Sequence, residues 1–439
     1  MLIRFTAGNF RSIKDPVTLS MEAVGIHEFD DSNVIPLENK TRLLKSSSIY
    51  GANASGKSNI IKALAFMVNH VKTSAKEMQT GDAAGLEPFL LDKECLSEPS
   101  FFEVEFVYGG DKYRYGFTLN NVPGHALSWD SEIGGNTLQD NIAAEWLYLT
   151  AAKEFPLFIR ENNELIKLSP QFPEGNVWRK MTAKTGVGLR SNALFISTLG
   201  QLFGSTSEKE SHSNRVISWI NKIQLINGLN DERIMNFTLN AIRSKKYIDQ
   251  INSLINNADL GIQQILVDYS ERAATGKENP SEKIMTVHLL PDGKEKVVFD
   301  MLSQESEGTK KIFALSAILC EVLEKGDILL FDEFDARLHP LLSWKLVELF
   351  HESNTKHAQL ILATHDTNLL SPKLFRRDQI WFTEKGANGA TRLYSLVEFK
   401  TTAGGVRLGA SYEKNYILGQ YGAIPVLKNF DIGSDSHEE

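Results

Sequence analysis

The pattern of apolar residues divides the chain into strand-like and helix-like parts. The first 150 residues hold short apolar runs bounded by turn residues, and Gly109-Gly110-Asp111 separates two alternating runs as in a hairpin. Residues 59–67 instead have their apolar side chains at helical spacing. The strands predicted in this part are residues 2–5, 17–19, 48–50, 101–108, 112–119 and 144–149.

From about residue 150 the pattern becomes mainly helical. Helical spacing is clear at 216–220 and 247–255, but no heptad repeat continues long enough to predict a coiled coil. Residues 271–283 are polar and charged, as in a linker. We therefore expect four parts: an N-terminal part (1–150), a helical insertion (151–283), a C-terminal part (284–430) and a flexible tail (431–439).

The C-terminal part begins with another predicted hairpin, residues 284–290 and 295–299. Two predicted strands follow, 328–331 and 359–363, which are apolar throughout except for Gln359, and such runs are typical of strands buried on both faces of a parallel sheet. About thirty residues separate corresponding points of these runs, which is room for one crossover helix at roughly 339–353.

Composition narrows the class of protein. The 439 residues carry a formal net charge of −8, which argues against a uniformly basic DNA clamp. Cys95 and Cys320 lie far apart without metal-ligand spacing, so we expect free thiols in a reducing compartment. The first residues lack the apolar core of a signal peptide, and no apolar run approaches the ~20 residues of a membrane span. We expect a cytoplasmic protein with no membrane partner.

The segment Gly51–Ser58 fits the pattern G-x-x-x-x-G-K-[ST] of a phosphate-binding loop and lies between a predicted strand and a predicted helix. Its glycines let backbone N–H groups turn toward phosphate oxygens, and the helix adds its positive N-terminal end. Lys57 should reach the β- and γ-phosphates, and Ser58 should ligate Mg²⁺. The alternative is a turn that only caps a helix. The residues expected around the nucleotide are Gly51, Asn53, Ala54, Ser55, Gly56, Lys57, Ser58 and Asn59.

Two carboxylates follow the buried run at 328–331 directly. Asp332, at the carboxyl end of this strand, can hold Mg²⁺ through its water shell, and Glu333 is suited to accept a proton from an attacking water. His365 ends the next buried run and should lie beside them, close to a γ-phosphate. Taken singly, each of these residues could equally be a structural residue at a strand end.

A further candidate lies at the start of the helix predicted from Ser306 onward. Ser306 is suited to cap this helix, with Thr309 at the third position. The Ser-x-Gly start, which includes Gly308, could also bind a phosphate that approaches from outside the chain. Simple capping is the alternative.

The order of these segments resembles that in the ABC-type ATPase heads of the structural-maintenance, RecF and overcoming-lysogenization-defect (OLD) proteins. The closest likeness is to the bacterial RloA-like AAA family ATPases, which are often found in phage-defence operons. Further segments that carry the resemblance are Asn9–Ser12, Tyr113–Phe117, Glu305–Thr309, Asp335–Pro340, Arg376–Ile380 and Tyr421–Pro425.

The resemblance implies an α/β fold of the ABC-ATPase head type, with a mixed β-lobe, a parallel sheet with helices, and a mainly helical insertion. It also implies ATP and Mg²⁺ as ligands and a homodimer, or higher oligomer, that sandwiches two nucleotides. Ser306 and Gly308 of one copy would touch the γ-phosphate held by Lys57 of the other. Asp335 would lie at the dimer seam, His365 would sense the γ-phosphate, and Arg11 would contact the nucleotide.

The sequence also departs from the family pattern. The signature reads Glu-Ser-Glu-Gly-Thr rather than the Leu-Ser-Gly-Gly-Gln of transporters, and no glutamine-loop residue can be assigned. No cysteines of a zinc hook interrupt a coiled coil. About 75 residues follow His365, too few for a TOPRIM nuclease domain of the OLD type, so a nuclease would be a separate protein.

Three functions compete. The first is a nucleotide-switched sensor and regulator in a bacterial defence module that controls a separate effector. The second is a RecF-like DNA-repair ATPase, with 40–45 and 243–246 as DNA phosphate contacts. The third is a scaffold with an inactive site. The choice between ATP and GTP stays open.

Overall fold

The computed structural model describes residues 1–38, 41–76, 85–120, 141–186, 188–203, 211–258, 261–268, 283–399 and 411–425. Of the linker expected at 271–283, only Lys283 belongs to these residues, and it begins a strand. The tail expected at 431–439 lies outside them.

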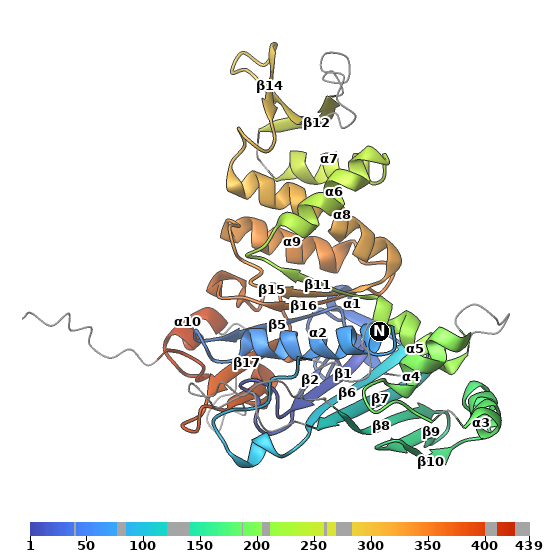
Figure 1. Cartoon of the computed structure of the whole chain (residues 1–439). Coiled ribbons are helices and arrows are strands. Elements are labelled where there is room, and N and C mark those ends of the chain that lie inside the picture. Colours follow the sequence, from blue (N-terminus) through green and yellow to red (C-terminus); the bar gives the residue numbers. More distant parts are fainter. Residues whose placement is uncertain are drawn as a thin grey trace, which may run out of the picture.

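A six-stranded sheet with strand order β11-β15-β16-β5-β17-β18 forms the centre of the molecule (Figure 1). Strands β11 to β17 in this order are all parallel, and β18 is antiparallel to β17. Every residue of β5, β15 and β16 is buried. This burial explains the apolar runs of β15 and β16 and confirms the parallel strands expected from them. The bounds are β5 Ser46–Gly51, β11 Ile223–Asn227, β15 Ile328–Asp332, β16 Gln359–Ala363, β17 Ile380–Lys385 and β18 Thr391–Ser395.

A seven-stranded antiparallel sheet with order β10-β9-β8-β7-β6-β1-β2 forms the β-lobe. The strands expected in residues 1–150 are all present, although most are longer than predicted. The strands of the lobe are β1 Leu2–Gly8, β2 Val17–Ser20, β6 Ser100–Tyr108, β7 Asp111–Asn120, β8 Asn141–Thr150, β9 Glu154–Glu161 and β10 Glu164–Leu168.

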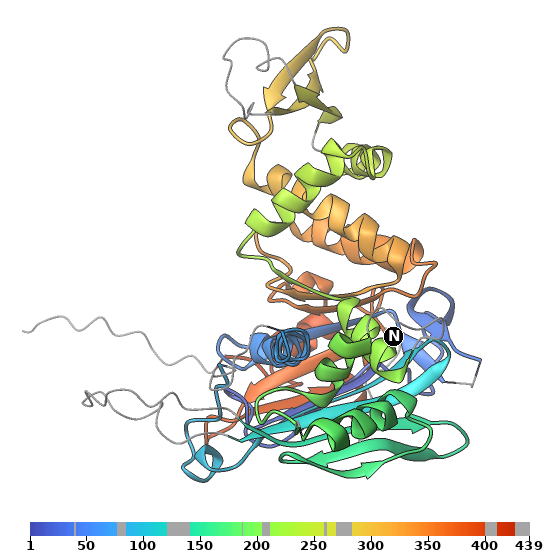
Figure 2. The ribbon, with the colours of Figure 1, turned by 45° about the vertical axis from the view of Figure 1, so that its right-hand side comes forward.

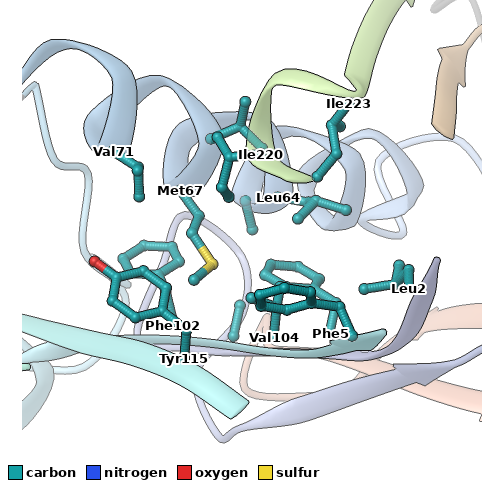
Figure 3. Close-up of a cluster of buried hydrophobic side chains, with 14 of the residues drawn as sticks. Leu2, Phe5, Leu64, Met67, Val71, Phe102, Val104, Tyr115, Ile220 and Ile223 are labelled. Atoms are coloured by element: carbon teal, nitrogen blue, oxygen red, sulfur yellow. The ribbon is translucent and has the colours of Figure 1, made fainter. Parts of the chain in front are cut away.

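Helix α2 (Lys57–Thr73) packs between the two sheets. Figure 3 shows Leu64, Met67 and Val71 of α2 pointing onto Phe102 and Val104 of the lobe. Because α2 begins at the end of the predicted phosphate-binding loop, this buried apolar contact fixes the direction in which the loop faces.

Helices α8 (Glu307–Lys325) and α9 (Pro340–Glu352) cover the other face of the central sheet and share a second core with α6 (Glu232–Arg243) and α7 (Ile248–Asn257). Helix α9 is the crossover helix expected between β15 and β16. Beyond α7 and α8, a three-stranded sheet projects from the molecule (Figure 2). Its strands are β12 Ile262–Asp268, β13 Lys283–Leu289 and β14 Lys296–Asp300, of which β13 and β14 form the expected hairpin.

The segment expected as a helical insertion, 151–283, is interrupted by strands that belong to three different sheets. β9 pairs with β8 and β10 with β9, so the lobe continues past residue 150 to Leu168. β11 pairs in parallel with β15 and belongs to the central sheet. Because β10 is largely exposed and β11 has only five residues, neither shows the clear period-2 pattern by which strands are recognised.

The remaining elements are short or lie around the lobe. Residues 25–45 have a polar, loop-like sequence, yet they contain two short paired strands, β3 and β4. In the described part of the chain, no helix is both long and apolar enough to cross a membrane. The remaining bounds are α1 Asp30–Asn33, β3 Val34–Pro36, β4 Arg42–Leu44, η1 Glu94–Leu96, α3 Pro173–Thr185, α4 Phe195–Phe203, α5 His212–Asn221, η3 Thr367–Leu369, η4 Arg377–Gln379, η5 Leu396–Glu398 and α10 Tyr412–Ile417.

A buried ion pair joins the lobe to the chain segment that enters α4. Glu145 and Arg160 are both fully buried, with 3.6 Å between their charged groups. Glu145 accepts hydrogen bonds from the backbone N–H groups of Phe195 and Ile196, and Arg160 donates to the carbonyl of Ala193 at 2.7 Å. Burial raises the pKa of Glu145, and the charge of Arg160 opposes that shift. Each charge therefore depends on the other.

Replacing Arg160 with Met should lower the free energy of unfolding by about 3–5 kcal/mol, because it leaves a buried carboxylate without its counter-charge. Urea unfolding followed by tryptophan fluorescence measures this loss. Arg4→Met, which removes a half-exposed ion pair to Glu22 in the same sheet, should cost less than about 1 kcal/mol. Equal losses in the free energy of unfolding for the two variants would contradict the expectation that the buried ion pair stabilises the fold more than the half-exposed one.

Candidate functional site

The loop between β5 and α2 has the backbone of a phosphate cradle. Gly56 has φ +110°, and a Cβ atom there would lie 2.1 Å from Oγ1 of Thr391. Ala54 also takes a left-handed backbone conformation, with φ +60°. A glycine is therefore required at position 56 both by its conformation and by the closeness of β18.

Lys57 is held inside this loop. Its side chain is buried, and Nζ donates hydrogen bonds to the carbonyl oxygens of Gly51 at 2.8 Å and Ala52 at 3.1 Å. Burial lowers the pKa of Lys57 to about 8, and the carboxylates of Glu333 and Asp332 partly oppose this shift. The ammonium group is thus desolvated and placed at the loop, where a phosphate would replace the carbonyl oxygens as its partner.

Ser58 and Asp332 meet across the sheet. β16 lies between β5 and β15, yet Oγ of Ser58 donates a hydrogen bond of 2.9 Å to Oδ1 of Asp332. A hydroxyl and a carboxylate together offer the hard oxygen ligands that Mg²⁺ prefers, and Mg²⁺ keeps several waters in such sites. The two residues therefore fit the metal roles expected for them, although neither residue type is specific to magnesium.

Glu333 and His365 lie at adjacent strand ends. Glu333 has φ +55°, a left-handed conformation that non-glycine residues rarely take. Partial burial and the nearby charge of Lys57 lower the pKa of His365, while the carboxylates of Glu333 and Asp335 oppose this. The charges of Lys57, Glu333 and Asp335 therefore all act on His365, which is the proximity that the order of the motifs predicts.

Asp335 ties these two strand ends together. Its Oδ1 accepts hydrogen bonds from Oγ1 of Thr364 at 2.6 Å and from the backbone N–H of His365 at 3.1 Å. Within one copy of the chain, the carboxylate that we expect at a dimer seam therefore orients the loop that carries His365.

A chain of hydroxyl contacts joins the N-terminal turn to the phosphate loop. Nδ2 of Asn59 donates to Oγ of Ser12 at 2.6 Å, and this hydroxyl lies 2.7 Å from Oγ1 of Thr391. Thr391 in turn donates to the carbonyl of Ser55 at 2.9 Å. Asn59 therefore positions the loop through its neighbours.

The remaining expected contacts have different environments. Nη2 of Arg11 lies 2.6 Å from Oε1 of Glu87, so contact with a nucleotide would compete with this ion pair. Asn53 is exposed at the tip of the loop. Oγ of Ser55 is buried 2.7 Å from Oγ1 of Thr383.

Ser306 caps α8 as predicted, with its Oγ accepting from the backbone N–H of Thr309 at 3.1 Å. A Cβ atom at Gly308 would have no neighbour closer than 3.6 Å, the carbonyl oxygen of Arg337. Nothing that contacts this position in the described part of the chain requires a glycine. Helices α8 and α2 pack on opposite faces of the central sheet (Figure 1), so the structure does not bring Ser306 and Gly308 together with Lys57 in one copy.

The sequence reasoning missed several residues that support the site. Thr383 and Thr391 contact the phosphate loop from β17 and β18, more than 300 positions away in the chain. Gly228 follows β11, and its N–H donates to the carbonyl of Asp332 at 2.8 Å. The sequence signal that could have marked it is the pair Asn227-Gly228, because Asn-Gly is typical of turns. Asn227, the last residue of β11, is in register with Asp332. It is an asparagine, and it does not fill the glutamine-loop role, to which no residue could be assigned from the sequence.

One of the two expected DNA contacts is not supported. Lys45 is buried and donates to the carbonyl of His351 at 2.8 Å, and Arg42 is paired with Asp30. Lys40 lies outside the described residues. The lysine and arginine side chains at 243–246 are exposed at the end of α6.

Comparison with known proteins agrees with this geometry. A family model described as "AAA domain, putative AbiEii toxin, Type IV TA system" matches residues 46–135 and 173–371. No curated protein matches the sequence.

Among solved structures, the chain is similar to the SMC head domain from Thermotoga maritima, with 15% identity and a TM-score of 0.42 over 90% of this chain and 98% of that one. It is also similar to an Smc head domain bound to the C-terminal domain of ScpA derived from Pyrococcus furiosus, with 14% identity and a TM-score of 0.36 over 90% of this chain and 96% of that one. Scores this low support no inference about the chain.

The family model spans the phosphate loop, the helix start at Ser306, the carboxylates after β15 and His365 after β16, and it covers more than half of the chain. The fold combines a P-loop, an antiparallel β-lobe and a mainly parallel central sheet. The chain belongs to the family of AAA domains described as "AAA domain, putative AbiEii toxin, Type IV TA system".

Proposed function

We propose that the chain binds and hydrolyses MgATP as a nucleotide-sandwich dimer and acts as the nucleotide-switched sensor and regulator of a bacterial anti-phage defence module with a separate effector. The observation that carries the enzymatic part is the hydrogen bond between Ser58 and Asp332, 2.9 Å long. It joins the end of the phosphate loop to the carboxylate strand, as a shared magnesium site requires.

In this proposal each side chain has a stated task. Lys57 and the loop N–H groups bind the β- and γ-phosphates. Ser58 and Asp332 would hold Mg²⁺, which would supply positive charge to the phosphate oxygens. Glu333 accepts the proton of the attacking water, and His365 holds the γ-phosphate in position.

The dimer follows from the position of α8. Among the residues that the structure describes, no neighbour of Gly308 requires a glycine there, and a phosphate that approaches this helix start would give such a reason. Ser306 lies beside it at the start of α8, the helix that packs on the opposite face of the sheet from α2 of the same copy. A second copy, turned to face the first, would supply the missing triphosphate.

The regulatory part rests on the family and on the order of the segments. The family description names a putative AbiEii toxin of a type IV toxin–antitoxin system, and we take this as support for a role in a defence module. The chain carries an ATPase head and a small projecting sheet, and we assign effector activity to a neighbouring gene product. A nucleotide-dependent shape change in the head would then control the effector.

The affinity for MgATP should fall as the pH rises above about 8. Burial lowers the pKa of Lys57 to about 8 in the free protein, and a bound phosphate would raise it. Above that pH, binding must take up a proton, so the affinity should fall by about tenfold per pH unit. Titration with a fluorescent nucleotide measures this slope. Lys57→Arg keeps its positive charge over this pH range, so the affinity of this variant should depend less on pH. An unchanged dependence of affinity on pH would assign the titration to another group.

Mixing two inactive variants should restore hydrolysis if the site is shared between copies. Lys57→Ala and Ser306→Arg should each be inactive alone. A mixed dimer has one site with both changes and one site with neither, so an equal mixture should recover about a quarter of the parent activity. Phosphate release measures this. Lys57→Ala mixed with Glu333→Gln should recover nothing, because these residues act in one copy. No recovery in the first mixture would reject the shared site.

Nucleotide state should change the complex with the effector. Glu333→Gln removes the base but keeps the phosphate cradle, so it should hold ATP and trap the dimer, whereas Lys57→Ala should stay nucleotide-free. The product of a neighbouring gene should therefore copurify to different extents with these two variants. If this chain without any neighbour gives full protection against phage in cells, the regulatory role is wrong.

A further inference from the structure

Lys311 is fully buried on the helix that begins at Ser306. Its side chain has no exposed area, which is rare for lysine unless the charge is paired. Nζ donates a hydrogen bond of 2.7 Å to the carbonyl of Gly228 and forms an ion pair with Asp231. Burial lowers the pKa of Lys311, and Asp231 opposes that shift. The lysine therefore clamps α8 to the turn that follows β11.

This turn packs directly against the backbone of the two site carboxylates. The N–H of Gly228 donates to the carbonyl of Asp332 at 2.8 Å. A Cβ atom on Gly228 would lie only 1.9 Å from the carbonyl oxygen of Glu333. The left-handed conformation of Glu333 costs free energy and persists only where its surroundings impose it. The turn, which Lys311 holds, is one of these surroundings.

A second, exposed connection runs beside the buried one. Nη1 of Arg337 lies 3.2 Å from Oδ2 of Asp231 and 3.7 Å from a carboxylate oxygen of Glu307, the first residue of α8. The side chains of Arg337 and Glu307 are 47% and 66% exposed, so solvent screens this connection. The buried contacts of Lys311 carry the greater constraint, because little water is present to replace them.

We propose that Lys311 is a positioning residue for ATP hydrolysis, which transmits the position of the Ser306 helix to the backbone of Glu333. Ser306 faces the nucleotide of the partner copy, whereas Glu333 serves the nucleotide of its own copy. Lys311 lies five residues after Ser306 on the same helix. It reaches Glu333 through Gly228, whose carbonyl accepts its hydrogen bond and which packs against the backbone of Glu333. It thus links the two sites of a dimer. This inference rests on the proposed function as an ATPase.

Lys311→Met in the full chain should lower kcat for ATP hydrolysis by at least about tenfold, because small displacements of a catalytic group are costly. The affinity for ATP should stay within about twofold of the parent, since Lys57 and its loop lie across the sheet. Lys311→Arg keeps the charge and the donors and should recover much of kcat. Lys325→Met, which removes a half-exposed ion pair at the far end of the same helix, should leave kcat unchanged.

A double-variant cycle with Glu333→Gln tests whether Lys311 acts through Glu333. If it does, Lys311→Met should cause no further loss in the residual hydrolysis of Glu333→Gln. A purely structural role would lower both backgrounds by the same factor, together with ATP affinity and thermal stability, and would overturn the inference. If Lys311→Met does not fold, Asp231→Asn weakens the same clamp and should show the same loss of kcat at unchanged ATP affinity.

The two proposals fail in different ways. A parent chain that hydrolyses no nucleotide contradicts the proposed function itself. A parent that is active, and that Lys57→Ala inactivates, combined with parent-like kcat for Lys311→Met and Asp231→Asn, overturns only the role of Lys311.

Discussion

The complete burial of three adjacent parallel strands is the constraint on which the site depends. β5, β16 and β15 expose no residue, so their backbone groups must pair with one another and their ends must meet at one edge of the sheet. At that edge Ser58 reaches Asp332 although β16 lies between their strands. A displacement of any of these strands would separate the phosphate loop from the carboxylates.

The charged groups at this edge of the central sheet then determine which ligands can bind there. The carboxylates of Glu333, Asp332 and Asp335 all act on the buried ammonium group of Lys57. Burial disfavours that positive charge, and the carboxylates restore part of its stability. A site with three carboxylates and one lysine favours a cation, so under the proposed function a triphosphate would bind better with its magnesium ion than without it.

Positions outside the motifs carry much of the support. Thr391 and Thr383 hold the phosphate loop from the last two strands of the sheet, and Gly228 supports Glu333 from a turn after β11. Asp335 orients the loop of His365. These contacts join segments that are far apart in the chain, so each motif depends on residues that no local pattern connects to it.

The sequence by itself determined the phosphate loop, the buried strands at 328–331 and 359–363, the crossover helix between them and the cap at Ser306. Each of these is a local pattern whose residue types follow from backbone geometry or from burial on two faces. The sequence did not reveal that β9 and β10 extend the lobe or that β11 joins the central sheet, because short or exposed strands leave little periodicity.

Only the tertiary structure decided which distant residues meet. It buried Lys45, which the sequence presented as a DNA contact, and it placed Lys311 beneath the turn that supports Glu333. It also put α8 and α2 on opposite faces of the sheet. The physical reason is that local spacing fixes the direction of a side chain on its own element, whereas its partners depend on how the sheets and helices pack.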